Sequence, residues 1–213
     1  MKITSHREHG LLVLEIFIVV ATIALLLSLF PSHRGGEARA TRISCVHNLK
    51  QVGLAYRLWA NDHKDQFPFA FTNEGSSFRF VNSPQVFLHY AVMSNELVTP
   101  KILACPEGKK RGKAIDFTQF SNKNVSYFVG LDAREDQPQT ILSGDRNIMG
   151  GTLSNGFMRR FTSLTEAKWT AEIHKNAGNI GLGDGSVQQV TSVALNRQIR
   201  AMTNASVIRF AMP

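Results

Sequence analysis

Side chains that could bind a metal ion lie in the C-terminal half of the chain. His174 precedes Asp184 by ten positions, and Asp145 lies in the segment "GDRN" (144–147). Imidazole and carboxylate groups together suit several divalent cations. A site for a metal or a partner, built from His174, Asp184 and Asp145, is therefore one interpretation of this part of the sequence.

Backbone geometry offers a competing interpretation of the same residues. Asp184 and Gly185 separate the segments "NIGLG" and "SVQQV", and an Asp-Gly pair between two strands is typical of a two-residue type I′ hairpin turn. In "GDRN", Asp145 could accept hydrogen bonds from nearby amides while Arg146 stays solvated. Alternatively, Asp145 and Arg146 could form a buried pair that holds the loops over the sheet.

The sequence contains no recognisable enzyme motif. It lacks a Ser/His/Asp arrangement, a nucleophile elbow, a P-loop and an HExxH helix. Six histidines lie in separate segments without ligand spacing: His9, His33, His47, His63, His89 and His174. Cys45 and Cys105 belong to no CxxC or Cys/His zinc pattern. The formal charge is +8, but the lysines and arginines are spread along the chain, which favours a solvated basic surface over nucleic-acid binding. We predict a non-enzymatic protein without a cofactor.

One carboxylate interrupts the longest apolar run. Residues 11–30, "LLVLEIFIVVATIALLLSLF", have Glu15, Thr22 and Ser28 as their polar members. As a helix the run would cover about 30 Å, the thickness of the hydrocarbon layer of a membrane. It is too long for the apolar region of a signal peptide cleaved at "ARA" (38–40). A plain membrane anchor explains the length but gives no reason for Glu15.

The N-terminal segment resembles the class III signal of type IV prepilins and pseudopilins. A basic leader ends at Gly10, Leu11 begins the apolar run, and Glu15 is the fifth residue after the glycine. The resemblance implies that a prepilin peptidase cleaves between Gly10 and Leu11 and methylates the new amine. It also implies that Glu15 meets this amine on a neighbouring subunit. Because a carboxylate and an ammonium attract strongly in a low dielectric, the pair would set the register of helices in a filament. Leu11 stands where the family usually has phenylalanine.

The rest of the chain resembles pseudopilin-like proteins of planctomycetes and verrucomicrobia. His174 and Asp184-Gly185 fit the H-x9-DG signature of their C-terminal region. Type II secretion pseudopilins bind calcium near C-terminal loops, so calcium is the ion that the resemblance implies, although no dense acidic loop is present and Leu182 and Ser186 replace the usual aromatic residue and histidine. The matching segments are "ISCVHNLKQVGLAYRLWANDHKDQFP" (43–68), "ILACPEGKKR" (102–111), "SYFVGLDA" (126–133), "ILSGDRNI" (141–148) and "IHKNAGNIGLGDGSV" (173–187).

The two cysteines allow a disulfide or two buried free thiols. Cys105 ends the apolar segment "ILAC", and Cys45 belongs to the apolar stripe of a helix, so both should point into the same core. The resemblance implies a periplasmic domain, and a disulfide persists in that oxidising compartment. The stripe consists of Cys45, Leu49, Val52, Tyr56 and Trp59.

The predicted fold class is α+β and pilin-like. A long helix over residues 11–62, kinked at Pro31, would span the membrane with its first half and pack with its second half on an antiparallel sheet. The expected parts are a leader (1–10), a transmembrane or filament-core helix (11–30) and a periplasmic globular domain (31–213). Further helices are predicted at 84–93 and 192–202, and strands near 125–130, 138–143, 168–174, 179–183, 186–190 and 206–211.

Two classes of function follow from the sequence. In the first, the chain is a pilin or pseudopilin subunit that is cleaved by prepilin peptidase and assembles with other subunits into a type II secretion or type IV pilus-like filament. In the second, it is a single-pass protein whose periplasmic domain binds a ligand or partner without polymerising. Both place the N-terminus in the cytoplasm and the apolar helix in the inner membrane.

Overall fold

The computed structural model describes residues 5–28, 33–108, 110–202 and 207–213, and within these ranges it describes side chains over 13–28 and from position 39 onward. The chain divides into two compact units, Met1–Arg39 and Ala40–Pro213. We call them the N-terminal and C-terminal units.

Two helices account for the N-terminal third of the chain. Helix α1 covers Ser5–Ser28 and helix α2 covers His33–Asn61. Apolar side chains of α1 between Val13 and Leu27 are 51–74% exposed. Residues 29–32, where we expected the kink at Pro31, lie outside the described residues.

The predicted membrane-spanning helix is not supported by the structure. Within the described residues, none of the helices combines the length and the apolar character needed to cross a membrane. The predicted fold class, with a membrane-spanning first half of one long helix, is therefore wrong, and so is the predicted inner-membrane location. The structure shows instead a mixed helix-and-sheet domain with a seven-stranded antiparallel sheet.

The seven-stranded sheet forms the centre of the C-terminal unit. Its strand order is β4-β5-β9-β1-β2-β7-β8, and every neighbouring pair is antiparallel. Strands β3 (Ile148–Gly150) and β6 (Ala167–Trp169) form a separate two-stranded sheet. The strands of the large sheet are β1 (Tyr127–Gly130), β2 (Ile141–Asp145), β4 (Thr152–Ser154), β5 (Met158–Phe161), β7 (Gly178–Leu182), β8 (Val187–Val190) and β9 (Ile208–Ala211).

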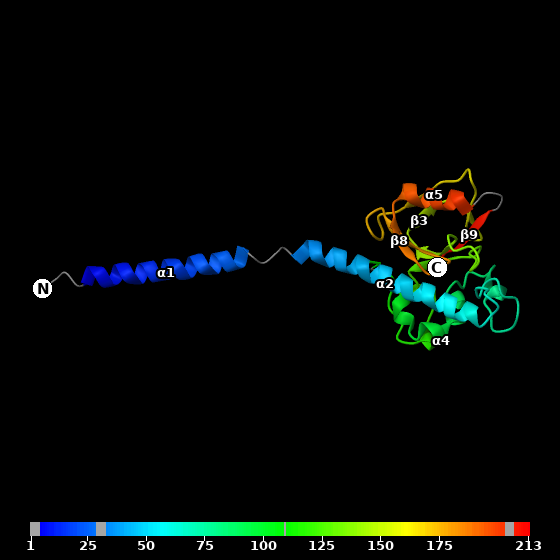
Figure 1. The fold of residues 1–213 in the computed structure, drawn as a ribbon, viewed down its shortest axis with the longest axis horizontal. Helices are drawn as coiled ribbons and strands as arrows, with labels where there is room; N and C mark the ends of the chain where they lie inside the picture. The colour runs from blue at the N-terminus through cyan, green and yellow to red at the C-terminus, as the bar shows by residue number, and fades with distance from the viewer. Residues whose placement is uncertain (1–4, 29–32, 109, 203–206) are drawn as a thin grey trace. The chain divides into compact units, whose positions relative to one another are not determined.

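Helices cover both faces of the large sheet. Helix α2 lies on one face and α5 (Ser192–Met202) on the other (Figure 1). Because successive residues of a strand point to opposite faces, Tyr127 and Val129 join the core beneath α2, whereas Phe128 joins the core beneath α5. The apolar stripe of α2 that includes Leu49 is buried, as its spacing of three and four residues predicts.

Short helices close one side of the α2 core. The predicted helix 84–93 is reduced to α3 (Leu88–Ala91), which is followed by α4 (Ser94–Leu97). Tyr90 of α3 places its hydroxyl 3.2 Å and 3.1 Å from the carbonyl oxygens of Tyr127 and Phe128, so this buried polar group is satisfied by the sheet. Single 3₁₀ turns cover Phe78–Phe80, Pro100–Leu103, Phe117–Gln119 and Asn122–Asn124.

The β7–β8 hairpin differs from the predicted type I′ turn. Gly181 pairs with Val187, and the Leu182 amide donates to the Ser186 carbonyl at 2.9 Å, which leaves a three-residue loop, 183–185. Gly185 has φ +81°. This is the arrangement of a type I turn followed by a left-handed glycine, and it needs the glycine at a single position.

Candidate functional site

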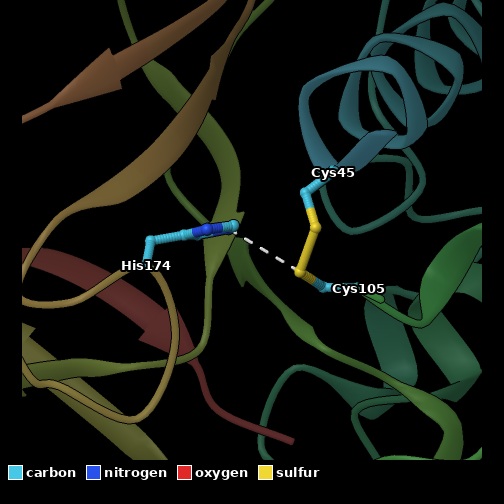
Figure 2. A group of neighbouring side chains, drawn as sticks. All are labelled: Cys45, Cys105 and His174. Atoms are coloured by element: carbon cyan, nitrogen blue, oxygen red, sulfur yellow. Dashed lines mark hydrogen bonds between the residues drawn. A yellow bond between two sulfur atoms is a disulfide. The ribbon is translucent and has the colours of Figure 1, made fainter. Parts of the chain in front are cut away.

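A disulfide joins α2 to the segment that follows the 3₁₀ turn Pro100–Leu103. The structure brings Cys45 and Cys105 together, with their Cα atoms 5.2 Å apart and 60 positions between them (Figure 2). Both residues are buried. In the chain-entropy account, closing a loop of this length stabilises the folded state by about 4 kcal/mol.

His174 lies beside this disulfide on a loop with an unusual backbone. His174, Lys175 and Asn176 have φ values of 57°, 50° and 65°, in the left-handed region that residues other than glycine rarely enter. Such strain persists only where the surroundings hold the loop. Here Asn147, just after β2, holds it with a side-chain amide within 2.8–3.2 Å of three carbonyl oxygens, those of Thr170, Ile173 and Ala177.

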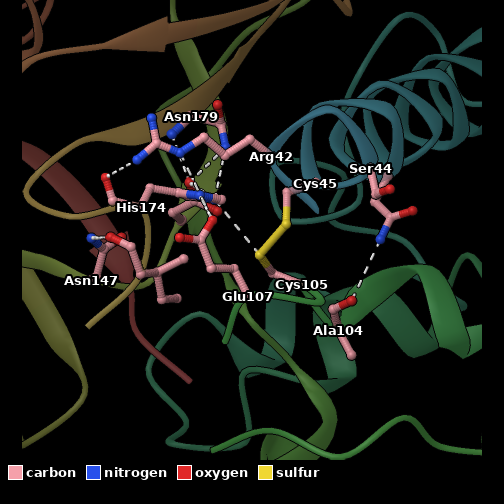
Figure 3. Close-up of a disulfide and its surroundings, with 12 residues drawn as sticks. Arg42, Ser44, Cys45, Ala104, Cys105, Glu107, Asn147, His174 and Asn179 are labelled. Carbon is pink, nitrogen blue, oxygen red and sulfur yellow. Dashed lines mark hydrogen bonds and ion pairs between the residues drawn. A yellow bond between two sulfur atoms is a disulfide. The ribbon is translucent and has the colours of Figure 1, made fainter. Parts of the chain in front are cut away.

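Both nitrogens of the His174 ring have side-chain partners (Figure 3). Nδ1 lies 2.5 Å from Oε2 of Glu107. Nε2 lies 3.1 Å from the side-chain amide of Asn179, 3.3 Å from Oδ2 of Asp145 and 3.6 Å from Sγ of Cys105. A carboxylate accepts and an amide nitrogen donates, so these partners assign the proton to Nδ1 and a lone pair to Nε2. Burial lowers the pKa of His174 although Glu107 opposes it, which favours the neutral imidazole.

Asp145 is the most deeply buried carboxylate of this cluster. Its Oδ2 accepts from the backbone amide of Asn179 at 2.6 Å and from the side-chain amide at 2.9 Å. Its Oδ1 has no hydrogen-bond partner among the described residues. Burial raises the pKa of Asp145 to about 7, against the effect of the Asn179 hydrogen bonds.

Arg146 fits neither of the two interpretations given for "GDRN". Its side chain is only 10% exposed and pairs with Glu172, with 3.0 Å between Nη2 and Oε1. It is therefore not solvated, and its ion pair is not with Asp145. Asp145 does accept amide hydrogen bonds, but they come from Asn179 on the neighbouring strand β7.

Asp184 and Gly185 are not part of the His174 cluster. His174 precedes β7 and Asp184 follows it, so the strand separates them. The backbone carbonyls of His174 and Asp184 nevertheless both accept a hydrogen bond from an arginine of α2. Arg42 Nη2 donates to the His174 carbonyl at 3.0 Å, and Arg57 Nη1 donates to the Asp184 carbonyl at 3.1 Å. The H-x9-DG segment thus binds α2 at both ends of β7.

Gly185 is also restricted by the helix. A Cβ added to Gly53 of α2 would lie 3.1 Å from the Cα of Gly185, so the turn and the helix approach backbone to backbone. The spacing of His174 and Asp184-Gly185 is explained by this packing, and the predicted metal site that joins His174 to Asp184 is not formed.

The predicted processing and assembly residues lie in the other unit. Gly10 and Leu11 fall within the backbone of α1, and Glu15 is exposed on the same helix. Cleavage between Gly10 and Leu11 and pairing of Glu15 with a neighbouring amine stay predictions.

The sequence alone did not indicate two members of the His174 cluster, Glu107 and Asn179. Glu107 follows Cys105 by two residues in "CPEG", and a turn closed by the Gly108 amide and the Cys105 carbonyl at 3.0 Å places it beside His174. Asn179 lies in β7, five residues after His174. The nearness of Glu107 to Cys105 was the available signal; no spacing in the sequence indicated Asn179.

Comparison of the whole chain with known protein families, with curated proteins and with solved structures gives no match in any of the three. The class of site is therefore defined by its geometry alone. It is a largely buried cluster in which the His174 imidazole lies between a disulfide and two carboxylates.

Proposed function

We propose that the chain is a structural subunit of a pilin- or pseudopilin-like filament and that it assembles through α1. The observation that carries the proposal is the exposure of this helix. Apolar side chains are exposed all around α1 between Val13 and Leu27. A helix that is apolar on every side is stable when other apolar surface covers it. The cover we propose is the α1 helix of further copies of this chain.

Glu15 supports this choice of partner. It is exposed on α1 between apolar neighbours, and a carboxylate is costly to bury there without a positive partner. Cleavage after Gly10 would create such a partner, the amine of Leu11, at the start of the same helix in a neighbouring copy. The ion pair would then select the helix register that brings the amine to the carboxylate.

Several attachments between α2 and the rest of the C-terminal unit suit a subunit that transmits force along a filament. The disulfide, the Arg42–His174 hydrogen bond and the Arg57–Asp184 hydrogen bond attach α2 to the domain at separate points. A pull along α2 would therefore be shared among these attachments and would not peel the helix from the sheet.

The proposal predicts that Glu15→Val abolishes or strongly reduces assembly. The variant removes the carboxylate, keeps α1 apolar and leaves the C-terminal unit unchanged. We would count sheared filaments by electron microscopy in cells that express the full chain with a prepilin peptidase. Glu74→Val is the matched control because it removes an exposed carboxylate from the C-terminal unit. Filament yields for Glu15→Val equal to those of the wild type and the control would contradict the pairing.

A further inference from the structure

Three buried side chains beside the sheet form a set of soft metal ligands. Sγ of Cys45, Sγ of Cys105 and Nε2 of His174 lie within 4.8 Å of one another (Figure 2). Thiolate sulfur and imidazole nitrogen are the ligands that proteins most often provide for structural zinc. In the oxidised protein the two sulfurs are bonded to each other, so their thiolate form appears only after reduction.

The distances around Nε2 fit a tetrahedral zinc ion. With bond lengths of about 2.3 Å to sulfur and about 2.0 Å to nitrogen or oxygen, tetrahedral angles place a sulfur roughly 3.5 Å and an oxygen roughly 3.3 Å from the nitrogen. Cys105 Sγ lies 3.6 Å and Asp145 Oδ2 lies 3.3 Å from Nε2 of His174. For the same geometry the two sulfurs must separate to roughly 3.8 Å. Asp145 lies outside the group whose ligand atoms are all within 4.8 Å of one another, so it is a neighbour of the site and not one of its ligands.

Glu107 gives the imidazole the orientation that a metal ligand needs. Its Oε2 lies 2.5 Å from Nδ1 of His174, so Nδ1 carries the proton and Nε2 keeps its lone pair 3.6 Å from Sγ of Cys105. A zinc ion bound there would replace the contact of Nε2 with the Asn179 amide at 3.1 Å. Metal-bound histidines commonly donate their other ring N–H to a carboxylate in this way, which fixes the tautomer and raises the basicity of the ligand.

Asp145 supplies an independent observation that points to a ligand. The side chain is fully buried, and its Oδ1 has no hydrogen-bond partner among the described residues. Buried polar atoms are nearly always paired, so an orphaned carboxylate oxygen calls for a partner. Oδ2 is the oxygen that lies near Nε2 of His174, which leaves Oδ1 to accept a hydrogen bond from a water that would complete the coordination of the zinc ion.

We propose that reduction of the Cys45–Cys105 disulfide creates a buried zinc site whose protein ligands are Cys45, Cys105 and His174. A dithiol reductant donates two electrons and two protons to the S–S bond and is itself oxidised to a disulfide. Zn²⁺ then replaces the two thiol protons, which pass to solvent, and two Zn–S bonds form. Disulfide and zinc exclude each other, because a disulfide sulfur is neutral and only the thiolate formed after reduction is a strong zinc ligand. This site is distinct from the assembly surface proposed for α1.

Cobalt titration of the full-length chain tests the site. The protein is reduced with dithiothreitol, freed of it by gel filtration under nitrogen, and titrated with Co²⁺, which takes the same tetrahedral geometry and is visible by absorption. We expect saturation at one equivalent, thiolate-to-cobalt charge-transfer bands in the near ultraviolet, and their loss on addition of Zn²⁺. The oxidised protein should give none of these bands. Absence of the charge-transfer bands at one equivalent, or equal binding by the oxidised protein, would overturn the proposal.

Variants separate the ligands from the general fold. Glu107→Ala removes the acceptor on Nδ1 of His174 and should weaken zinc affinity at least tenfold. Cys105→Ser should abolish the one-equivalent charge-transfer bands. His47→Gln is the matched control, because it removes an exposed imidazole from the helix that carries Cys45. Circular dichroism checks that each variant is folded. Wild-type affinity in a folded Glu107→Ala variant would contradict a site that uses His174 as a ligand.

Discussion

Asp145 and Asn179 join two neighbouring strands through two hydrogen bonds to one carboxylate oxygen. The backbone and side-chain amides of Asn179 both donate to Oδ2 of Asp145, at 2.6 Å and 2.9 Å. The same side-chain amide lies 3.1 Å from Nε2 of His174. Asn179 therefore links the end of β2 to the loop that carries His174, in a region without solvent to replace a lost bond.

Asn179→Ala should destabilise the C-terminal unit. The substitution removes the side-chain donor to Asp145 and His174, while the backbone amide still donates to Asp145, and the loss of a buried hydrogen bond to a carboxylate costs about 2–3 kcal/mol. Urea unfolding of the full chain measures the change. Asn73→Ala, at an exposed position, is the control and should stay within about 0.5 kcal/mol of the wild type. A similarly small effect for Asn179→Ala would show that the network contributes little.

Stability should fall with acid because of His89. The side chain is fully buried in the C-terminal unit, with Nδ1 2.9 Å from Oγ of Ser77, and burial lowers its pKa to about 4. An unfolded histidine has a pKa of about 6.5, so the unfolded state binds more protons between pH 6.5 and pH 4. The free energy of unfolding should therefore decrease as the pH falls through this window, by roughly 3 kcal/mol for the full shift.

The His89→Leu variant tests the sign of this effect. His89→Leu removes the titrating group. The difference between its free energies of unfolding at pH 7 and pH 4.5 should therefore be smaller than the wild-type difference by about 2–3 kcal/mol. His47→Gln, which removes an exposed histidine, should keep the wild-type pH dependence. Urea unfolding at both pH values gives the comparison. An unchanged pH dependence in His89→Leu would exclude His89 as the source.

The Cys45–Cys105 disulfide should protect both thiols from alkylation. In the unreduced protein, denatured before labelling, mass spectrometry should find neither cysteine modified, and reduction before labelling should add two labels. Reduction should also lower the free energy of unfolding by about 2–4 kcal/mol, because the unfolded chain regains the freedom of the closed loop. Full labelling of both residues without reductant would show that the bond is absent.

Local sequence patterns predicted the elements that depend on residue spacing or on a turn-forming pair. The apolar spacing of α2 predicted which side chains are buried, and the Asp184-Gly185 pair placed a hairpin in the right segment. The turn type was wrong because only Gly185 adopts positive φ, a difference of one residue in the loop. The short strands β3–β5 were missed because β3 and β4 have three residues each and β5 has four, too few to show an alternating pattern.

The cluster around His174 was only partly predictable because its contacts are long-range. Glu107 and His174 are 67 positions apart, and their pairing depends on how the 105–108 turn packs against the loop after β6. Apolar composition alone also overestimated the ability of residues 11–30 to span a membrane, because none of the helices in the described residues is long and apolar enough to do so. The structure also shows two helices, α1 and α2, where the sequence predicted one long helix.

The intact mass of the chain tests the filament-subunit account most directly. Full-length protein expressed with a prepilin peptidase should lose residues 1–10 and begin at Leu11, and methylation would add one methyl group to the new amine. The same protein expressed without the peptidase, and a Gly10→Val variant expressed with it, should keep the leader, because the peptidase needs a small residue before the apolar run. A wild-type chain that keeps residues 1–10 in the presence of the peptidase, or equal processing of the Gly10→Val variant, would contradict the account.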